Sequence, residues 1–195
     1  MFFDEDTKSS RYEIVESTFC NISTPNYIEF NPNELDVTDW LGYGLGGGIS
    51  ITFSNKSSNH SVLIEKCFFK DNTAPWGGGI HAKFLHSCNN TLISMNNSVF
   101  QRCKAKYAGG GIALGFAAHV LSDDYNNSVS IHNTNFLEND ALFGAGTYIF
   151  SFLGGIQTNE NKLIYFFNCV SVGISQALVY KCYMGIIYGR NCSKH

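Results

Sequence analysis

Few residues of this sequence have the types and spacing that catalysis requires. Asp123 and Asp124 form the pair that comes closest to the two carboxylates of a glycoside hydrolase. Those carboxylates must face the scissile bond from opposite sides, whereas adjoining residues in a polar segment indicate a solvated turn. A polysaccharide lyase would use acidic residues around calcium, and this sequence has few carboxylates in repeated positions. We therefore expect no catalytic residues and no enzymatic activity of the chain's own.

Potential metal ligands occur only in isolated pairs. His86 and Cys88 form one pair, and Cys192 and His195 form another. A zinc site needs three or four such ligands at characteristic spacings. The Gly-Gly-Gly runs lead into alternating strands and not into helices whose N-termini could hold a phosphate. The sequence therefore predicts no metal ion and no cofactor.

Asn-x-Ser/Thr sequons, the acceptor sites for N-linked glycans, are frequent in this sequence. They occur at Asn21, Asn55, Asn59, Asn89, Asn96, Asn126 and Asn191. Because glycans of this kind are added to secreted chains, the sequons predict an extracellular or cell-surface glycoprotein.

The composition fits one domain without a nucleic-acid-binding surface. The chain has 195 residues, of which 44% are hydrophobic, enough to fill a single core. Its net charge of −3 with 13 Lys and Arg residues offers no basic stripe for a phosphate backbone. The longest uncharged stretch, Ala141 to Ile156, is too short for a membrane span. The residues after Met1 lack the pattern of a signal peptide, so we expect a piece of a longer secreted protein.

A repeated motif organises most of the chain. It consists of Phe-x-x-Asn followed by alanine and then by glycines, and two clear copies begin at Phe69 and Phe136. A third copy begins at Phe100 with Cys103 in the asparagine position, and a degenerate fourth begins at Phe19. We expect equivalent residues to form ladders inside a stack of repeats. The predicted ladders consist of Phe19, Phe69, Phe100 and Phe136, and of Asn72, Cys103 and Asn139.

Alternating hydrophobic residues flank each motif. Val62 and Ile64 precede one copy, while Ile80, Ala82 and Phe84 follow its glycines. Polar residues just before the phenylalanine interrupt the alternation, which indicates a bend between two strands. Each repeat therefore predicts three short strands, and stacked repeats predict a solenoid. An antiparallel sandwich is the alternative, because it also combines short strands with glycine turns.

The combination of Phe-x-x-Asn with Gly-Gly-x-Ile resembles the repeats of polymorphic outer-membrane protein passenger domains. It is also similar to the wider group of right-handed parallel β-helix, pectin-lyase-like proteins. The resemblance extends from Tyr12 to Phe150 and is strongest from Val62 to Ile80. It implies an all-β, right-handed parallel β-helix of about four to five coils. It also implies a surface passenger, often an adhesive one.

We predict a single β-helix segment over residues 1–195 that forms part of a longer array. Regular coils cover about 12–150, with an insertion at 21–45. The pattern fades beyond this region, so 151–195 should hold a degenerate terminal coil and a tail.

Two sides of the expected solenoid should differ in character. Loops 54–61, 85–92 and 117–128 join equivalent strands, so their sequons should line up along one side. The insertion at 21–45 should emerge at a different corner, either as a contact loop or as a flap over the exposed first coil. Its candidate contact residues are Tyr27, Phe30, Trp40 and Tyr43. Trp76 begins a glycine corner, where it could stack on a sugar or pack against a neighbouring corner.

The seven cysteines cannot all pair within the chain. Cys67 and Cys103 have no cysteine directly above or below them in the predicted stack, so we expect them to be small buried residues. The cysteines in loops or the tail, which are better candidates for disulfides with undetermined pairing, are Cys20, Cys88, Cys182 and Cys192.

The leading functional hypothesis is an extracellular or cell-surface structural or adhesive module without catalytic activity. Its partner would be a cell-surface protein or a glycan. One alternative is a fragment of a carbohydrate-active enzyme, lyase-like or glycosidase-like, whose catalytic coils lie outside this chain. The other alternative is a non-catalytic glycan-binding module.

Overall fold

A computed structural model describes the strands of this chain and part of their connections. The described residues are 1–3, 8–24, 46–54, 56–85, 88–118, 127–153, 163–167, 170–172, 178–182, 186–190 and 193–194. Within them the structure contains β-strands and no helix, and every pair of neighbouring strands is parallel. The predicted all-β, parallel-stranded architecture is thus confirmed, but a complete repeat contains four strands and not the three that the sequence predicted, because the residues between the phenylalanine and the glycines form a short strand of their own.

The strands form four sheets, numbered here in the order in which each repeat passes through them. Sheet 1 contains, in order, β2 (Lys8–Val15), β5 (Ser58–Glu65), β9 (Leu92–Asn96), β13 (Ser128–His132), β17 (Leu163–Phe167) and β20 (Ile186–Arg190). Sheet 2 contains β3 (Thr18–Cys20), β6 (Phe68–Lys70), β10 (Val99–Gln101), β14 (Asn135–Leu137), β18 (Val170–Val172) and β21 (Ser193–Lys194). Sheet 3 contains β7 (Thr73–Trp76), β11 (Lys104–Ala108) and β15 (Asp140–Phe143). Sheet 4 contains β1 (Phe2–Phe3), β4 (Ile49–Phe53), β8 (Ile80–Phe84), β12 (Ile112–Ala118), β16 (Thr147–Leu153) and β19 (Leu178–Cys182).

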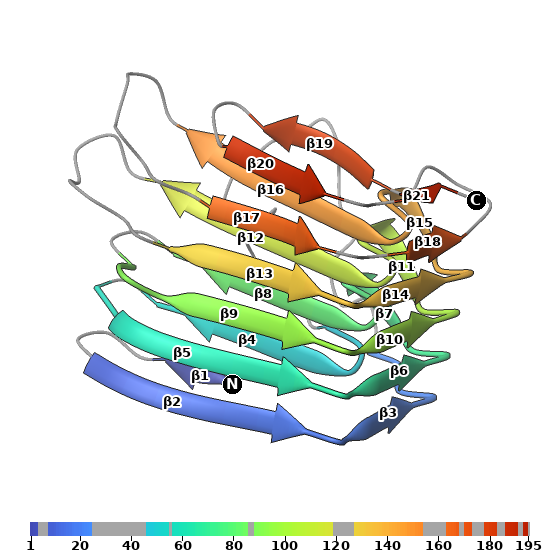
Figure 1. Ribbon diagram of the computed structural model, residues 1–195, viewed down its shortest axis with the longest axis horizontal. Helices are drawn as coiled ribbons and strands as arrows, with labels where there is room; N and C mark the ends of the chain where they lie inside the picture. Colours follow the sequence, from blue (N-terminus) through green and yellow to red (C-terminus); the bar gives the residue numbers. More distant parts are fainter. Residues whose placement is uncertain are drawn as a thin grey trace.

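Successive repeats pass through these sheets in the same order, so equivalent strands lie one above another (Figure 1). The register follows the motif that the sequence repeats. Phe100 pairs with Phe69 on one side and with Phe136 on the other. In sheet 4, Ile112 likewise pairs with Ile80 and with Thr147. Residues at the same position of the motif therefore lie in register on neighbouring strands.

The phenylalanine ladder is a continuous stack of rings. The ring centroids of Phe19 and Phe69 lie 4.9 Å apart, those of Phe69 and Phe100 lie 4.5 Å apart, and those of Phe100 and Phe136 lie 5.1 Å apart. These distances match the spacing of neighbouring strands, because each ring comes from the same position of the next strand. Phe69 and Phe100 are fully buried.

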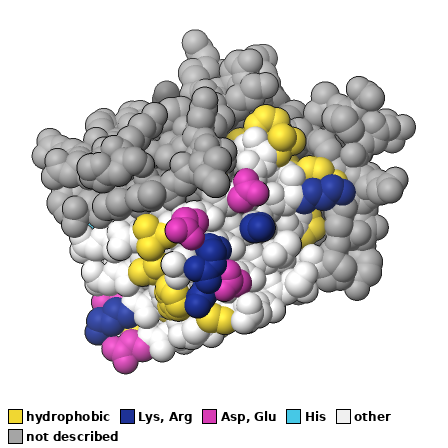
Figure 2. All heavy atoms as spheres, turned by 90° about the vertical axis from the view of Figure 1, so that its right-hand side faces the viewer, with side chains coloured by type: hydrophobic (Ala, Val, Ile, Leu, Met, Phe, Trp, Pro, Cys, Tyr) yellow, Lys and Arg dark blue, Asp and Glu magenta, His cyan; other side chains and the backbone are white. Residues whose placement is uncertain are grey.

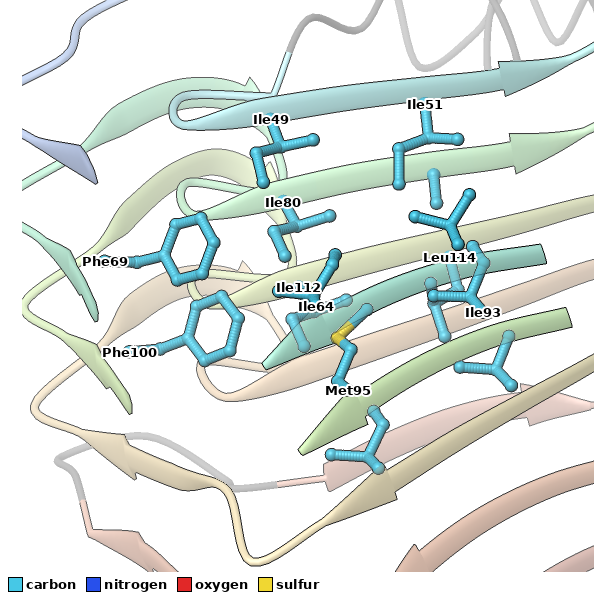
Figure 3. Close-up of a cluster of buried hydrophobic side chains, with 14 of the residues drawn as sticks. Ile49, Ile51, Ile64, Phe69, Ile80, Ile93, Met95, Phe100, Ile112 and Leu114 are labelled. Atoms are coloured by element: carbon cyan, nitrogen blue, oxygen red, sulfur yellow. The ribbon is translucent and has the colours of Figure 1, made fainter. Parts of the chain in front are cut away.

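Aliphatic columns from sheets 1 and 4 fill the rest of the core. Ile64, Met95 and Ile131 lie in register on sheet 1, and all three are fully buried. Figure 3 shows Ile64 and Met95 pointing toward the column of Ile80 and Ile112 on sheet 4. Alternation within short strands places these residues inside and their neighbours outside.

Asparagines of the motif bridge successive repeats. Asn72 accepts a hydrogen bond from the Ile22 backbone N–H at 3.0 Å and donates one to the Phe19 carbonyl at 2.9 Å. Asn139 repeats the arrangement with the N–H of Cys103 at 2.8 Å and the carbonyl of Phe100 at 3.0 Å. Both asparagines are buried, so these bonds satisfy backbone groups that water cannot reach.

Left-handed backbone conformations explain the bends on both sides of each phenylalanine. The bend before the phenylalanine places Glu16, Lys66, Asn97 and Asn133 at positive φ. The bend after it places Asn21, Asp71, Arg102 and Glu138 at positive φ. All eight φ values lie between 46° and 56°. Polar residues recur there because the side chains leave the core, and asparagine and aspartate tolerate this conformation best.

Glycines allow successive repeats to approach closely at the corner before sheet 4. A Cβ atom at Gly79 would lie 2.5 Å from Cδ1 of Phe100, in the next repeat. The missing side chain thus makes room for the stacked ring. The phenylalanine ring of one repeat therefore lies against the glycine of the preceding repeat, so the two recurring positions of the motif depend on each other.

We expect Thr147→Val to raise the free energy of unfolding by about 1–2 kcal/mol. Thr147 occupies the column of Ile80 and Ile112, and its buried Oγ1 has no hydrogen-bond partner among the described residues. Thr134→Val is the matched control, because Thr134 is also buried but donates to the His132 carbonyl at 2.9 Å. Urea denaturation should show a higher free energy of unfolding for Thr147→Val and a lower one for Thr134→Val. A loss of stability in both variants would contradict the placement of Thr147.

Candidate functional site

Sheet 3 carries a cluster of aromatic side chains on the face opposite the core. Ala74, Ala105 and Ala141 point inward and lie in register. Their outward neighbours Thr73 and Lys104 are exposed. Small inward residues bring the sheet close to the core, and the larger side chains are left for the outer surface.

A β-bulge places extra aromatic surface on β11. The register of this strand shifts between Ala105 and Ala108 relative to both neighbouring strands. The bulged strand therefore presents Tyr107, whose ring centroid lies 5.6 Å from that of Trp76. The Lys106 ammonium lies 5.1 Å from the centroid of the Tyr107 ring, at a distance typical of cation–π contacts. Bulges commonly re-aim side chains in this way.

The aromatic cluster continues to β15 and sheet 4. We call Trp76, Tyr107, Leu142, Phe143 and Tyr148 the aromatic strip. The Phe143 and Tyr148 ring centroids lie 6.2 Å apart, and burial raises the pKa of Tyr148. Leu142 and Phe143 are 70% and 44% exposed, respectively. Trp76 is only 8% exposed, so it packs against its neighbours and does not offer an open platform to a sugar.

Charged side chains accompany the bend between sheets 2 and 3. Arg102 donates from Nε and Nη2 to the two carboxylate oxygens of Asp71, both at 2.8 Å. These hydrogen bonds lower the pKa of the Asp71 carboxyl and raise that of Arg102. Figure 2 shows acidic, basic and hydrophobic side chains close together on this side of the molecule. Interaction surfaces commonly have polar groups such as this Arg102–Asp71 pair around an apolar centre.

The described sequons lie on two sides of the stack. Asn59 is exposed and Asn89 is half-buried, and the Asn59 backbone N–H donates to the Asn89 carbonyl at 3.0 Å. These two therefore line up as expected, although Asn59 lies within β5 and not in a loop. Asn21 is exposed at the bend after β3, and Asn96 is half-buried at the end of β9. Asn55, Asn126 and Asn191 lie outside the described residues.

Several residues considered for chemistry or contact lie outside the described part of the chain. They include Asp123, Asp124, His86, Cys192 and His195. The candidate contact residues of the insertion, Tyr27, Phe30, Trp40 and Tyr43, do so as well. Among the residues that the structure does describe, no three His, Cys, Asp or Glu side chains gather as metal ligands would. Nor does that part of the chain form a helix long and apolar enough to cross a membrane.

The described cysteines are free thiols. Cys67 and Cys103 are buried, as expected for small core residues. Cys88 lies in the connection between β8 and β9, as predicted, but it forms no disulfide with another described cysteine. It is 1% exposed, and its thiol lies 3.6 Å from the hydroxyl of Thr91. The alternation of residues within the strands could not reveal this burial.

Cysteine can replace asparagine at position 103 because its thiol has comparable partners. The Cys103 Sγ donates to the Phe69 carbonyl at 3.5 Å and lies 3.8 Å from the Gln101 carbonyl oxygen. Burial raises the pKa of this thiol to about 12. The residue therefore stays neutral at physiological pH and fills the asparagine position without a buried charge.

We expect the thiols of Cys67, Cys88 and Cys103 to resist alkylation in the folded chain, because only an accessible thiolate reacts. Half-buried Cys20 should react first, and peptide mapping by mass spectrometry resolves the four sites.

The folded state holds the Cys103 proton up to a pKa of about 12, whereas the ordinary pKa of a thiol is 9.0. Stability should therefore fall as pH rises above 9.0, and less so in a Cys103→Asn variant. Rapid native labelling of Cys103 would contradict its placement.

One buried asparagine was not predicted. Asn127 accepts from the Thr91 backbone N–H at 3.1 Å and donates to the Cys88 carbonyl at 2.7 Å. It forms, at the corner between sheets 4 and 1, the same kind of bridge that Asn139 forms at the other corner. Asn127 directly follows Asn126, the acceptor asparagine of a sequon. The sequon indicates glycosylation and gives no sign of the bridging role of Asn127.

Comparison with protein-family models, with curated proteins and with solved structures gives no match for this chain. The resemblance of the motif to known repeats therefore stays a prediction.

Proposed function

We propose that this chain is a segment of right-handed parallel β-helix that works as an extracellular or cell-surface structural or adhesive module without catalytic activity of its own. The recurrence of the same four sheets in the same order supports the β-helix. Connections between parallel strands of one sheet are right-handed in about 98% of cases, which supports the proposed handedness. The motif ladders support about four to five coils within a longer array.

The observation that carries the adhesive function is the exposed part of the aromatic strip. Leu142 and Phe143 are 70% and 44% exposed, and the Phe143 ring centroid lies 6.2 Å from that of Tyr148, which packs in one cluster with Trp76 and Tyr107. Isolated exposed hydrophobic residues are common, but a contiguous apolar patch with a polar rim marks an interaction surface. Because the strip lies on two sheets braced by stacked repeats, it needs little ordering on binding.

The sequons support an extracellular location for this module. Asn21 and Asn59 are exposed, so a glycan at either position would extend into solvent. Neither Asn59 nor Asn89 belongs to sheet 3, where Leu142 and Phe143 are exposed. Glycans there would leave the strip free to meet a cell-surface protein or glycan.

A binding assay tests the adhesive function. We expect Leu142→Ser/Phe143→Ser to abolish binding of the labelled chain to intact cells of the source organism while changing its melting temperature little. Lys104→Ser is the matched control, because Lys104 is exposed on the same sheet but outside the strip. Unchanged cell binding by the double variant, or no binding by the unaltered chain, would overturn this function.

Two competing functions predict different results. A non-catalytic glycan-binding module is favoured by the half-buried Tyr107 ring, and it would retain oligosaccharides on an array without altering them. A carbohydrate-active enzyme would shorten polysaccharides during prolonged incubation. Release of reducing ends or of unsaturated products would therefore exclude the proposed non-catalytic module.

A further inference from the structure

The sequons of this chain differ in where the fold places the hydroxyl that completes them. In glycan addition, the asparagine amide nitrogen bonds to the anomeric carbon of a lipid-linked oligosaccharide. The lipid diphosphate leaves, and the amide nitrogen loses a proton. The transferase also recognises the serine or threonine hydroxyl two residues later. Both the amide and the hydroxyl must therefore be within its reach.

The hydroxyl of the Asn96 sequon lies inside the stack. Ser98 is fully buried, and its Oγ donates to the Asn96 carbonyl at 2.9 Å and accepts from the Cys67 backbone N–H at 3.1 Å. The equivalent residues of the neighbouring repeats, Cys67 and Thr134, are buried as well. This position of the repeat therefore faces the core, where a transferase cannot reach the hydroxyl.

The hydroxyl of the Asn89 sequon is buried at the corner between sheets 4 and 1. Thr91 is 1% exposed, and its Oγ1 donates to the Asn89 carbonyl at 3.2 Å. The same carbonyl accepts from the Asn59 backbone N–H at 3.0 Å. On the other side, the Thr91 carbonyl accepts from the Ser128 N–H at 2.9 Å. Because both neighbouring repeats hold this segment, access to the hydroxyl requires the repeat to open.

The asparagine side chains of these two sequons nevertheless lie partly in solvent. Asn89 and Asn96 are both half-buried. Asn96 follows the fully buried Met95 in β9, so its side chain points outward from sheet 1. A glycan attached to either amide before folding can therefore stay outside the core when the repeat closes.

The Asn21 sequon has the opposite arrangement. Asn21 and Ser23 are both exposed, and Ser23 lies in register with Thr73 of sheet 3. The equivalent residues of the following repeats are also exposed, namely Thr73, Lys104 and Asp140. The accessibility of this hydroxyl thus follows from its position within the repeat, which faces outward each time.

We propose that Asn89 and Asn96 accept glycans only before their repeats fold, whereas Asn21 can also accept one afterwards. Folding and glycan addition compete at the first two sites, so their occupancy reports how long each repeat stays open during synthesis. This competition rests on the proposed function as an extracellular module, because the transferase meets only chains that enter the secretory pathway.

Glycan addition in vitro tests this order. The unglycosylated folded chain and synthetic peptides with the same sequons are each incubated with a purified oligosaccharyltransferase and its lipid-linked donor, and glycopeptides are measured by mass spectrometry. We expect the peptides to be modified at every sequon. In the folded chain, modification of Asn21 should be about tenfold or more faster than that of Asn89 or Asn96, because those two sites depend on local opening.

Two variants separate access from other effects. Asp71→Asn creates a sequon with exposed Thr73, at the position that Asn21 occupies in its own repeat. We expect the folded variant to accept a glycan at position 71 about as fast as at Asn21. Phe100→Ala weakens the repeat that contains Ser98, so modification of Asn96 should rise about tenfold or more as local opening becomes more frequent.

Equal rates at Asn21 and Asn96 in the folded chain would overturn the proposal. Peptides that accept no glycan, or a folded Asp71→Asn variant that is not modified at position 71, would overturn it as well. These measurements do not depend on where the chain works, so their failure is distinct from failure of the extracellular module in the cell-binding assay.

Discussion

Phe100→Ala is expected to lower the free energy of unfolding by about 3–5 kcal/mol, the range for a fully buried aromatic residue truncated in a packed core. The Phe100 ring stacks between Phe69 and Phe136, at centroid distances of 4.5 and 5.1 Å. Its edge also contacts Gly79 of the preceding repeat, so the substitution removes contacts with both neighbouring repeats. Chemical denaturation followed by circular dichroism measures the loss.

Phe19→Ala provides the matched comparison for this prediction. Phe19 belongs to the same ladder but is half-buried, and among the described rings it stacks only on Phe69. We therefore expect about half the loss seen for Phe100→Ala. Equal losses at the two positions, or a loss below about 1 kcal/mol at Phe100, would contradict a continuous internal ladder.

Gly78→Ala should destabilise the chain by about 3 kcal/mol or more, because the added methyl group meets rigid backbone. A Cβ atom there would lie 2.4 Å from the Gly110 carbonyl oxygen and 2.6 Å from that of Lys104. Both atoms belong to the next repeat, so relief requires the two repeats to separate. Thermal unfolding of the purified variant measures the effect.

Ala145→Gly is the control for the glycine corner. Ala145 follows Gly144 just as Gly78 follows Gly77, and it is buried at 3% exposure. Removing its methyl group should cost about 1 kcal/mol or less. Similar small effects at both positions would show that the repeats are not in contact through Gly78.

The sequence was sufficient to predict the residues that repeat in register. Phe69, Phe100 and Phe136 mark the same position of successive repeats, and parallel pairing brings equal positions together. The inward direction of Asn72 and Asn139 followed from the same alignment. These predictions depend on spacing alone, which parallel strands preserve.

Features that depend on the shape of connections could not be predicted in this way. The burial of Cys88 and the bridging role of Asn127 arise outside the strands, between sheets 4 and 1. The bulge that presents Tyr107 depends on one strand having more residues than its neighbours, which alternation does not reveal. The aromatic strip could not be assembled from the sequence for the same reason, and only Trp76 among its members was a candidate for binding.

A designed disulfide tests most directly whether successive repeats stack as parallel strands in the register of the motif, the central feature of this structure. Ser94 and Ser130 lie opposite each other on β9 and β13, with their hydroxyl oxygens 3.2 Å apart. Their Cα separation should be about 4.8 Å, which suits a disulfide. Ser94→Cys/His132→Cys places the cysteines diagonally, at about 7–8 Å, and serves as the control.

Mass spectrometry of peptides after mild oxidation reads the result. We expect a crosslink between positions 94 and 130 in most molecules, with native stability retained, and little crosslink between 94 and 132. Efficient crosslinking of the diagonal pair, or none at 94 and 130, would contradict the parallel stack and its register.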